Sequence, residues 1–371
     1  MTGSLPILDD IRRRAKKFQQ TIVLAEAHDD RVLQAADFVL KENLVAELIL
    51  LGPEEKTRNR AKELSLNIDR ALVIDPATSH LAEEFAENLH ERRKHKGLTP
   101  EQALAQVRTN LFFGASMVKF GLADGMVAGS LSPTPKVIQA GLFCIGTAPG
   151  LKTMSSFFLM ATPRTELGVN GNLIYADCGL LPNPTAEQLV DIAHEAAGHC
   201  RILLDVEPMV AFLSFSTYGS AEHPEVDKVR TAVKLFKEKY PEIKADGELQ
   251  LDAAIIAEVG SKKAPGSPVA GKANVLIFPD LDSGNIGYKL TERFSQGSAV
   301  GPIFQGLDVP INDLSRGCKW QDIVDALCVT ALQAINRKQA KKLSTAGAGR
   351  PDIAQRKRHK EEVLATSSAN G

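Results

Sequence analysis

The sequence lacks the signals of export and of membrane insertion. Its opening residues, MTGSLPILDDIRRRAKKF, contain no apolar stretch of the kind found in a signal peptide. No run reaches the roughly 18 consecutive apolar residues that a membrane-spanning helix needs. We therefore expect a cytoplasmic protein without a membrane partner.

Cysteine and net charge are also scarce. The five cysteines are odd in number and lack the paired spacing of a metal site, which favours free thiols in a reducing compartment and argues against structural zinc. The formal net charge is −1. A general nucleic-acid-binding protein carries a basic excess, so we do not expect nucleic acid as a partner. Because the cysteines lack the spacing of a metal site, we expect no metal either.

Several catalytic fingerprints are missing. The first apolar run is not followed by GxGxxG, and the chain contains no Walker A loop, no HExxH and no GxSxG. Residues 29–36, DDRVLQAA, occupy the place where a dinucleotide-binding fold needs its glycines. These absences argue against dinucleotide oxidoreductases, P-loop NTPases, zinc proteases and common esterases.

What is present is an alternation of strand and helix patterns. The chain has 371 residues, 44% of them apolar and 24% charged, which suits a globular protein of two domains. Apolar runs at 21–28, 46–52 and 71–75 predict strands, and amphipathic stretches between them predict helices. Asp29 and Asp30 are candidate N-caps for the first of these helices. This order predicts a parallel sheet with helices on its faces.

A composition break at TAPG (147–150) predicts a domain boundary. Beyond it, residues 152–161 and 171–179 predict paired strands. Thr185 and Gln188 have the spacing of a capping box at the start of a helix. Residues 247–255 predict the opening of another helix.

Three polar turns follow predicted strands, at 216–220, 279–285 and 312–318, and the second contains a predicted Gly284–Asn285 turn. Serine hydroxyls, backbone N–H groups and an arginine fork all donate to phosphate oxygens, so these turns suit an anionic ligand. The same residue types are common in ordinary β-turns, and both interpretations stay open on spacing alone. The basic run ERRKHKG (91–97) is equally compatible with a solvated helix end and with an anion site.

The composition changes again after Asn336. Residues 337–371 have little apolar content and a basic excess, which predicts a largely disordered, solvated tail.

Long segments of the sequence resemble the phosphate acetyltransferase (phosphotransacetylase) family. They include ADCGLLPNPTAEQLVDIA, IFPDLDSGNIGYKLTERF and GPIFQGLDVPINDLSRGC, and the resemblance runs from about residue 8 to residue 336. It implies an acyltransferase of acetate metabolism that converts acetyl phosphate and coenzyme A reversibly to acetyl-CoA and phosphate. Coenzyme A is then a substrate, no cofactor is needed, and the protein is expected to be a homodimer.

The resemblance also implies a fold. We expect two α/β/α domains with mainly parallel sheets, like those of isocitrate and isopropylmalate dehydrogenases, and an active-site cleft between the domains. Residues 1–150 plus 305–336 are expected to form the first domain, which carries the catalytic loop. Residues 151–304 are expected to form the second domain and the dimer contact, and 337–371 the tail.

The family's functional residues map onto positions in both halves of the chain. Asp322 resembles the base that takes the proton of the coenzyme A thiol. Ser315 resembles the serine that hydrogen-bonds the reacting group, and Arg316 the arginine that binds the phosphoryl group. Arg93 resembles a second arginine that contacts an anionic substrate. Direct attack of the thiolate on the acyl phosphate needs no covalent acyl-enzyme.

One position departs from the family pattern. Gln139 stands where the family carries an arginine, and Lys136 lies one helical turn earlier on the same face. Ser216, Gly284 and Asn285, from two of the polar turns, complete the predicted substrate-binding set. The substitution is compatible with weaker anion affinity, with a different acyl preference or with a changed role.

Three alternatives remain beside the leading hypothesis. One is a phosphate butyryl or propionyl transferase, and another is a non-catalytic paralogue that binds coenzyme A. The third, a metal- and nicotinamide-dependent hydroxyacid dehydrogenase, is disfavoured because Asp280 and Asp282 lack a third acidic partner in the sequence.

Overall fold

The structure is a computed structural model that describes residues 5–345, and the chain divides into two compact units. The first domain comprises Ile11–Gly146 and the described residues from Leu307 onward. The second domain comprises Thr147–Gly306 together with the described residues up to Asp10. These limits lie a few residues from the boundaries expected at 150 and 305, and the start of the chain falls in the other unit.

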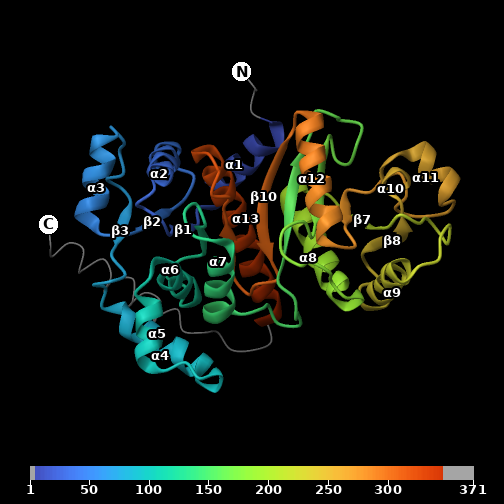
Figure 1. Cartoon of the computed structure of the whole chain (residues 1–371). Coiled ribbons are helices and arrows are strands. Elements are labelled where there is room, and N and C mark those ends of the chain that lie inside the picture. Colours follow the sequence, from blue (N-terminus) through green and yellow to red (C-terminus); the bar gives the residue numbers. More distant parts are fainter. Residues whose placement is uncertain (1–4, 346–371) are drawn as a thin grey trace. The chain divides into compact units, whose positions relative to one another are not determined.

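The first domain is built on a five-stranded sheet of order β11-β4-β1-β2-β3. Three of its strands, β1, β2 and β3, are labelled in Figure 1. Every neighbouring pair in this sheet is parallel. Parallel sheets are covered on both faces, and β1, β2 and β4 are accordingly almost entirely buried. The strands are β1 (Thr21–Leu24), β2 (Glu47–Leu51), β3 (Leu72–Ile74), β4 (Gly125–Ala128) and β11 (Ile311–Asp313).

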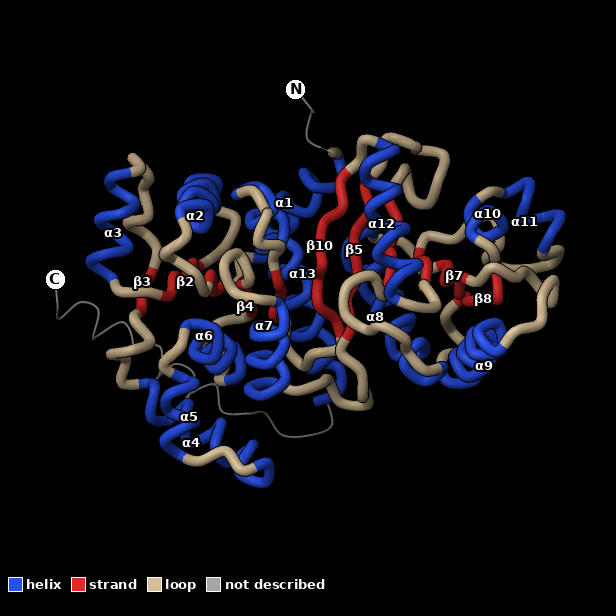
Figure 2. The backbone as a smooth tube through the Cα atoms, viewed as in Figure 1, coloured by secondary structure: helices blue, strands red, loops and turns tan. Residues whose placement is uncertain are grey.

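Helices connect these strands and cover the sheet (Figure 2). They are α2 (Asp30–Glu42), α3 (Glu54–Glu63), α4 (Leu81–Arg93), α5 (Pro100–Val107), α6 (Asn110–Lys119), α7 (Thr134–Ala140) and α13 (Trp320–Thr345), with the short helical segments η1 (Lys94–Lys96) and η2 (Gly141–Ile145). Helix α1 (Pro6–Phe18) opens the chain. None of the helices within residues 5–345 is both long enough and apolar enough to cross a membrane.

The second domain contains a six-stranded sheet of order β10-β5-β6-β9-β7-β8. β10 pairs with β5 and β5 with β6 in antiparallel fashion, and the remaining pairs are parallel. The predicted pairing of 152–161 with 171–179 is therefore confirmed. The strands are β5 (Ser155–Ala161), β6 (Asn172–Ala176), β7 (Met209–Leu213), β8 (Lys244–Leu249), β9 (Val275–Ile277) and β10 (Ser298–Gln305).

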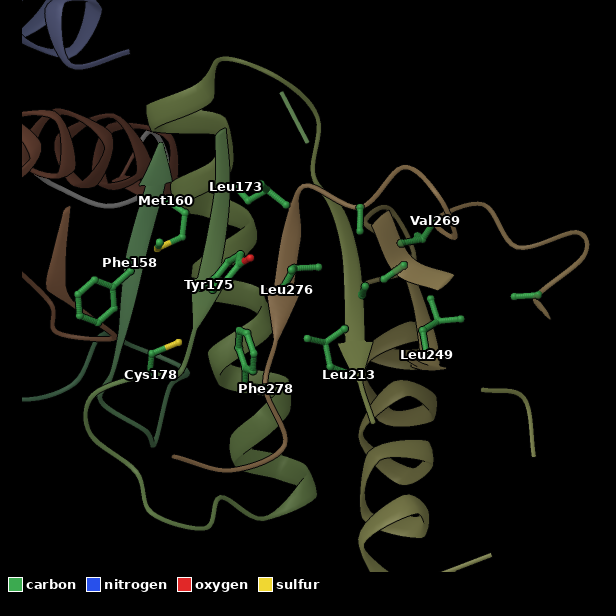
Figure 3. Close-up of a cluster of buried hydrophobic side chains, with 14 residues drawn as sticks. Phe158, Met160, Leu173, Tyr175, Cys178, Leu213, Leu249, Val269, Leu276 and Phe278 are labelled. Carbon is green, nitrogen blue, oxygen red and sulfur yellow. The ribbon is translucent and has the colours of Figure 1, made fainter. Parts of the chain in front are cut away.

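A buried cluster of side chains lies on one face of this sheet (Figure 3). Phe158, Tyr175 and Leu276 reach it from three neighbouring strands, and Phe278 follows β9 into it. The helices of the domain are α8 (Ala186–Leu204), α9 (Pro224–Lys239), α10 (Leu251–Ile255), α11 (Ala257–Lys263) and α12 (Leu281–Ser295). The predicted α/β class with mainly parallel sheets is confirmed in both units.

Local capping signals were predicted correctly. The Asp29 side chain caps α2 by accepting a hydrogen bond from the Arg31 amide. Thr185 and Gln188 form the expected capping box at the start of α8. These signals act within one helical turn, so they can be recognised without knowledge of the tertiary structure.

Three predictions about the chain's elements were wrong. Gly284 and Asn285 do not form a turn, because Asp280 caps α12 and both residues lie inside that helix. Residues 247–255 begin in β8 and reach α10 only at Leu251. Helix α13 continues past Asn336 to Thr345, and the rest of the predicted tail, 346–371, lies outside the described residues.

Gly284 brings α12 against the chain that follows β6. A Cβ atom at this position would lie 2.4 Å from the carbonyl oxygen of Asp177 and 3.1 Å from Cys178 Sγ. The nearest atom belongs to the backbone, so a side chain at position 284 would fit only if that backbone moved. At Gly198 in α8, a Cβ atom would have no heavy atom within 4 Å other than those of its own helical backbone and its chain neighbours.

These two glycines predict opposite effects of the same substitution. Gly284→Ala should destabilise the protein, since a backbone segment has to move. Gly198→Ala should stabilise it by up to about 1 kcal/mol, because alanine is the better helix former. Denaturant unfolding of both variants measures the two changes, and an equal shift in the same direction would contradict the close approach of α12.

Candidate functional site

The loop between β11 and α13, residues 314–319, carries two of the predicted site residues. Ser315 and Arg316 are both exposed there. The loop closes on itself, because the Gly317 amide donates to Ser315 Oγ at 3.2 Å and the Cys318 amide donates to the Ser315 carbonyl at 2.9 Å. The hydroxyl and the guanidinium are thus presented from a compact turn at the carboxyl end of a parallel strand, where ligands of open α/β sheets bind.

Asp322 lies in the first turn of α13, directly after this loop. Its Oδ2 accepts a hydrogen bond of 2.8 Å from the Lys319 amide, and its side chain is exposed. The carboxylate therefore satisfies one of the unpaired N–H groups at the helix start, where the helix dipole favours negative charge. Asp322 follows Ser315 and Arg316 closely in the chain, and this contact orients its carboxylate at the helix start.

Arg31, which the sequence analysis did not single out, holds the loop in place. Its Nη1 donates to the carbonyl oxygens of Arg316 and Cys318, each at 2.8 Å, and its Nη2 donates to the carbonyl of Ser130, also at 2.8 Å. One guanidinium thus joins the start of α2, the chain after β4 and the loop after β11. A rigid fork of donors is suited to this task, and a lysine is not.

Asp29 orients the Arg31 guanidinium. Its carboxylate accepts from Arg31 Nη2 at 2.7 Å and from Arg31 Nε at 3.0 Å. Burial alone would raise the pKa of Asp29, but these hydrogen bonds hold the pKa below its ordinary value. In the loop itself, burial raises the pKa of the Cys318 thiol to about 11, so this thiol is protonated at neutral pH.

A second buried carboxylate shapes the chain between β4 and α7. Glu26 is 2% exposed and accepts hydrogen bonds from the amide and hydroxyl of Ser130 and from the amides of Leu131 and Ser132. Charge-assisted bonds of this kind are among the stronger ones in proteins. They fix the entry to α7, which carries two more predicted residues.

Lys136 and Gln139 lie on one face of α7, three residues apart. Lys136 is exposed and Gln139 is partly exposed. Helix α7 packs against β11 and against η2, so its face belongs to the same part of the first domain as the loop after β11.

Arg93 is the last residue of α4, and its guanidinium lies over the ring of Phe143 in η2, 3.8 Å from the ring centre. The neighbouring Arg92 donates to the carbonyls of Phe143 and Ile145. The basic run is therefore more than a solvated helix end, because two of its arginines tie α4 to the segment that follows α7. The Arg93 side chain remains partly exposed.

The remaining predicted residues lie in the second domain, where they contact other residues of the chain. Ser216 is fully buried, and its hydroxyl donates to Glu248 at 2.9 Å and accepts from the Ala221 amide. Gly284 supports the close approach of α12. Asn285 donates to the Cys178 carbonyl at 3.2 Å and accepts from Lys289. These contacts shape the loops of that domain, and a direct substrate contact by the three residues stays a prediction.

The first domain thus carries the loop after β11, the start of α13, α7 and the end of α4, on which six of the predicted residues lie: Ser315, Arg316, Asp322, Lys136, Gln139 and Arg93. The residues that sequence reasoning missed are the ones that hold these elements. Glu26 and Arg31 were not singled out, and Asp29 was predicted only as a helix cap. All three follow the first strand, in the stretch EAHDDR, and their charge in this short segment was the only available signal.

Comparison with known proteins gives a consistent result. The family model described as phosphate acetyl/butaryl transferase matches residues 6–331. A phosphate acetyltransferase of Thermoanaerobacterium thermosaccharolyticum is 49% identical over 330 residues, covering 89% of this chain and 100% of its own length. The corresponding protein of Clostridium acetobutylicum is also 49% identical, covering 89% of this chain and 99% of its own.

Solved structures agree. A phosphotransacetylase from Streptococcus pyogenes superimposes with a TM-score of 0.84 at 40% identity, covering 89% of this chain and 98% of that one. A branched-chain phosphotransacylase from Enterococcus faecalis has a TM-score of 0.62 at 18% identity, which shows a shared fold.

The contacts of Arg31 predict a specific loss of stability. Arg31→Lys keeps the charge but removes the fork that reaches three carbonyls, and we expect it to lower the free energy of unfolding by about 1–3 kcal/mol. Denaturant unfolding measures this change. Arg108→Lys is the matched control, because Arg108 makes one exposed ion pair with Glu83, and exposed pairs contribute little. Equal effects of the two substitutions would rule out the holding role.

Proposed function

The chain belongs to the phosphate acetyl/butaryl transferase family, and we propose that it uses the loop after β11 to transfer the acetyl group of acetyl phosphate to coenzyme A. The enzyme is an acyltransferase, and the reaction is reversible. The observation that carries the assignment of the site is the exposed Ser315–Arg316 pair beside Asp322, held from behind by Arg31. The relatives named phosphate acetyltransferase support the choice of acetyl over butyryl.

The proposed reaction begins with proton transfer. Asp322 takes the proton of the coenzyme A thiol, and the resulting thiolate attacks the carbonyl carbon of acetyl phosphate. A carbon–sulfur bond forms, the carbon–oxygen bond to phosphate breaks, and phosphate leaves with the bonding electrons. Within the described residues, Asp322 Oδ2 accepts one backbone hydrogen bond, which supports a fixed orientation of the carboxylate toward a substrate.

Arg316 and Ser315 are proposed to bind the group that carries the charge. A guanidinium binds phosphate oxygens in bidentate fashion, and the serine hydroxyl donates to the acyl oxygen or to phosphate. The loop is preorganised by its internal bonds and by Arg31, so little reorganisation is needed as charge develops.

Lys136 and Arg93 are proposed to supply further positive charge for the anionic substrate. Gln139, at the position of a family arginine, offers a neutral amide there. The Arg93 guanidinium lies over the ring of Phe143, and this contact supports a defined orientation of the N–H donors of Arg93. We expect weaker anion affinity than an arginine at position 139 would give, with the reaction itself unchanged.

A homodimer is proposed from the surface of α12. Ile286, Leu290 and Phe294 are 57%, 50% and 83% exposed and recur every four residues, so they form one apolar stripe on the helix. Exposed apolar stripes of this kind mark interaction surfaces. A second copy of the chain is the proposed partner.

We also place the protein in the cytoplasm. All five cysteines are free and buried, which is compatible with a reducing compartment.

The test of the function is formation of the thioester by the purified chain. With acetyl phosphate and coenzyme A, absorbance of the thioester should rise, and propionyl and butyryl phosphate should be poorer substrates. Coenzyme A binding in calorimetry without turnover of any acyl phosphate would instead support a non-catalytic role. A preference for butyryl phosphate would reassign the substrate.

Two substitutions separate the proposed roles. Asp322→Asn should lower kcat by about 10²–10⁴-fold with little change in KM, because it removes the base. Arg316→Ala should chiefly raise KM for acetyl phosphate, because it removes a charged hydrogen-bonding group from the anion. Steady-state kinetics distinguish these patterns, and the reverse pattern would show that the roles are interchanged.

The proposed dimer predicts a change in mass. Phe294→Asp should convert a dimer into a monomer, because it places a charge at the most exposed residue of the stripe, which the contact would bury at a cost. Sedimentation equilibrium measures the mass directly. Phe18→Asp is the control, since Phe18 is also exposed but lies at the end of α1. A monomeric wild-type protein, or a dimer that survives Phe294→Asp, would contradict this surface.

A further inference from the structure

β11 ends in two polar side chains that point to opposite faces of the sheet, as successive strand residues do. Asn312 is fully buried, and its Nδ2 donates to Thr330 Oγ1 and to Gln333 Oε1, each at 2.7 Å. Thr330 and Gln333 belong to α13. Asn312 therefore fixes the helix that carries Asp322.

Asp313 makes the matching contact on the other face. Its side chain is 2% exposed, and Oδ2 accepts a hydrogen bond of 2.5 Å from Thr134 Oγ1. Thr134 is the first residue of α7, the helix that carries Lys136 and Gln139. Asp313 thus ties α7 to the residue immediately before the loop of Ser315 and Arg316.

Gly129 makes room for this carboxylate. A Cβ atom there would lie 2.0 Å from Asp313 Oδ1 and 2.7 Å from the Leu314 amide, and the backbone has φ +98°, a conformation that favours glycine. β4 and β11 pair in register at Ala128 and Asp313, so the glycine follows directly where the two strands end. The arrangement leaves the carboxylate enclosed between the two loops.

The enclosed carboxylate is a costly group. Among the described residues, the hydroxyl of Thr134 is the side-chain donor to the Asp313 carboxyl group, and the Leu314 amide is a backbone donor to it. Burial raises the pKa of Asp313 to about 7, and the negative charge of Glu26 adds to this effect. An apolar side chain would fill the same space without this penalty, so the cost requires an explanation other than stability.

We propose that Asp313 is a positioning residue of the transfer reaction. Through Thr134 it sets the position of Lys136 and Gln139 relative to Ser315 and Arg316, while Asn312 sets that of Asp322 from the other face. The anion-binding groups on two elements are then held in one geometry by the last two residues of a single strand. This role rests on the proposed function.

The test uses Thr134→Val and Thr134→Ser in the full chain. Valine is branched like threonine but lacks the hydroxyl, and serine keeps it. We expect Thr134→Val to lower kcat/KM for acetyl phosphate by about tenfold, the order of an unmet hydrogen bond to a charged group, and Thr134→Ser to retain most of the activity. Thr231→Val, which removes an exposed hydroxyl bonded to Asp227 in α9, is the matched control and should leave kcat/KM unchanged.

Hydrogen exchange gives a readout that does not need activity. In Thr134→Val the amides of residues 314–318 should exchange faster than in the wild type or in Thr134→Ser, because the loop has lost one of its attachments. Unchanged exchange, or faster exchange with unchanged kcat/KM, would overturn the positioning role. An inactive wild type with a normal exchange response would instead overturn the proposed function and leave the attachment established.

The pH dependence of stability tests the state of the carboxyl group. The pKa of Asp313 in the folded protein lies above its value in the unfolded chain, about 3.9. Its contribution to stability is therefore fully present below about pH 4 and is lost as the pH rises through about 7. Melting temperatures between pH 5 and 8 should fall less steeply in Asp313→Asn than in the wild type. Identical slopes would place the carboxyl in a different environment from the one described.

Discussion

The proposed site depends most on the hydrogen bonds that the Arg31 guanidinium donates. It bonds to three backbone carbonyls that come from two loops, and Asp29 fixes its orientation. Backbone carbonyls cannot move without moving the side chains beside them, so Ser315 and Arg316 inherit their positions from Arg31. The charge of Arg31 is matched by the Asp29 carboxylate, so the contribution of Arg31 to the site is to hold the backbone.

Buried carboxylates provide the other recurring constraint, and each acts within its own domain. In the first domain, Glu26 gathers the donors of the chain after β4, and Asp313 holds α7. In the second domain, Asp177 accepts amides of the chain after β6, and Glu248 accepts from Arg230 and the loop of Ser216. Loops at the carboxyl ends of strands need such acceptors because their N–H groups have no strand partner. At Glu248 the hydrogen bonds offset the cost of burial and hold the pKa below its ordinary value, whereas at Asp313 burial prevails and raises the pKa to about 7.

Local features of the fold could be predicted from the sequence, whereas features that depend on distant contacts could not. Asp29 and the Thr185–Gln188 box cap helices within one turn, so their patterns are visible in the chain. Gly284 was assigned to a turn because Asp, Ser, Gly and Asn favour turns, but the Asp280 cap and the packing of α12 decided in favour of a helix. The site residues were predicted through the family resemblance. Arg31 was missed because its carbonyl partners lie 99, 285 and 287 residues away and have no side-chain signature.

A crystal structure with coenzyme A and inorganic phosphate bound would test the central claim most directly. The account predicts that phosphate lies within hydrogen-bond distance of Arg316 and Ser315, and that the thiol faces Asp322. It also predicts that Arg31 still donates to the carbonyls of Arg316 and Cys318 in the complex. Phosphate bound away from the loop, or an Arg31 that has left these carbonyls, would contradict the account.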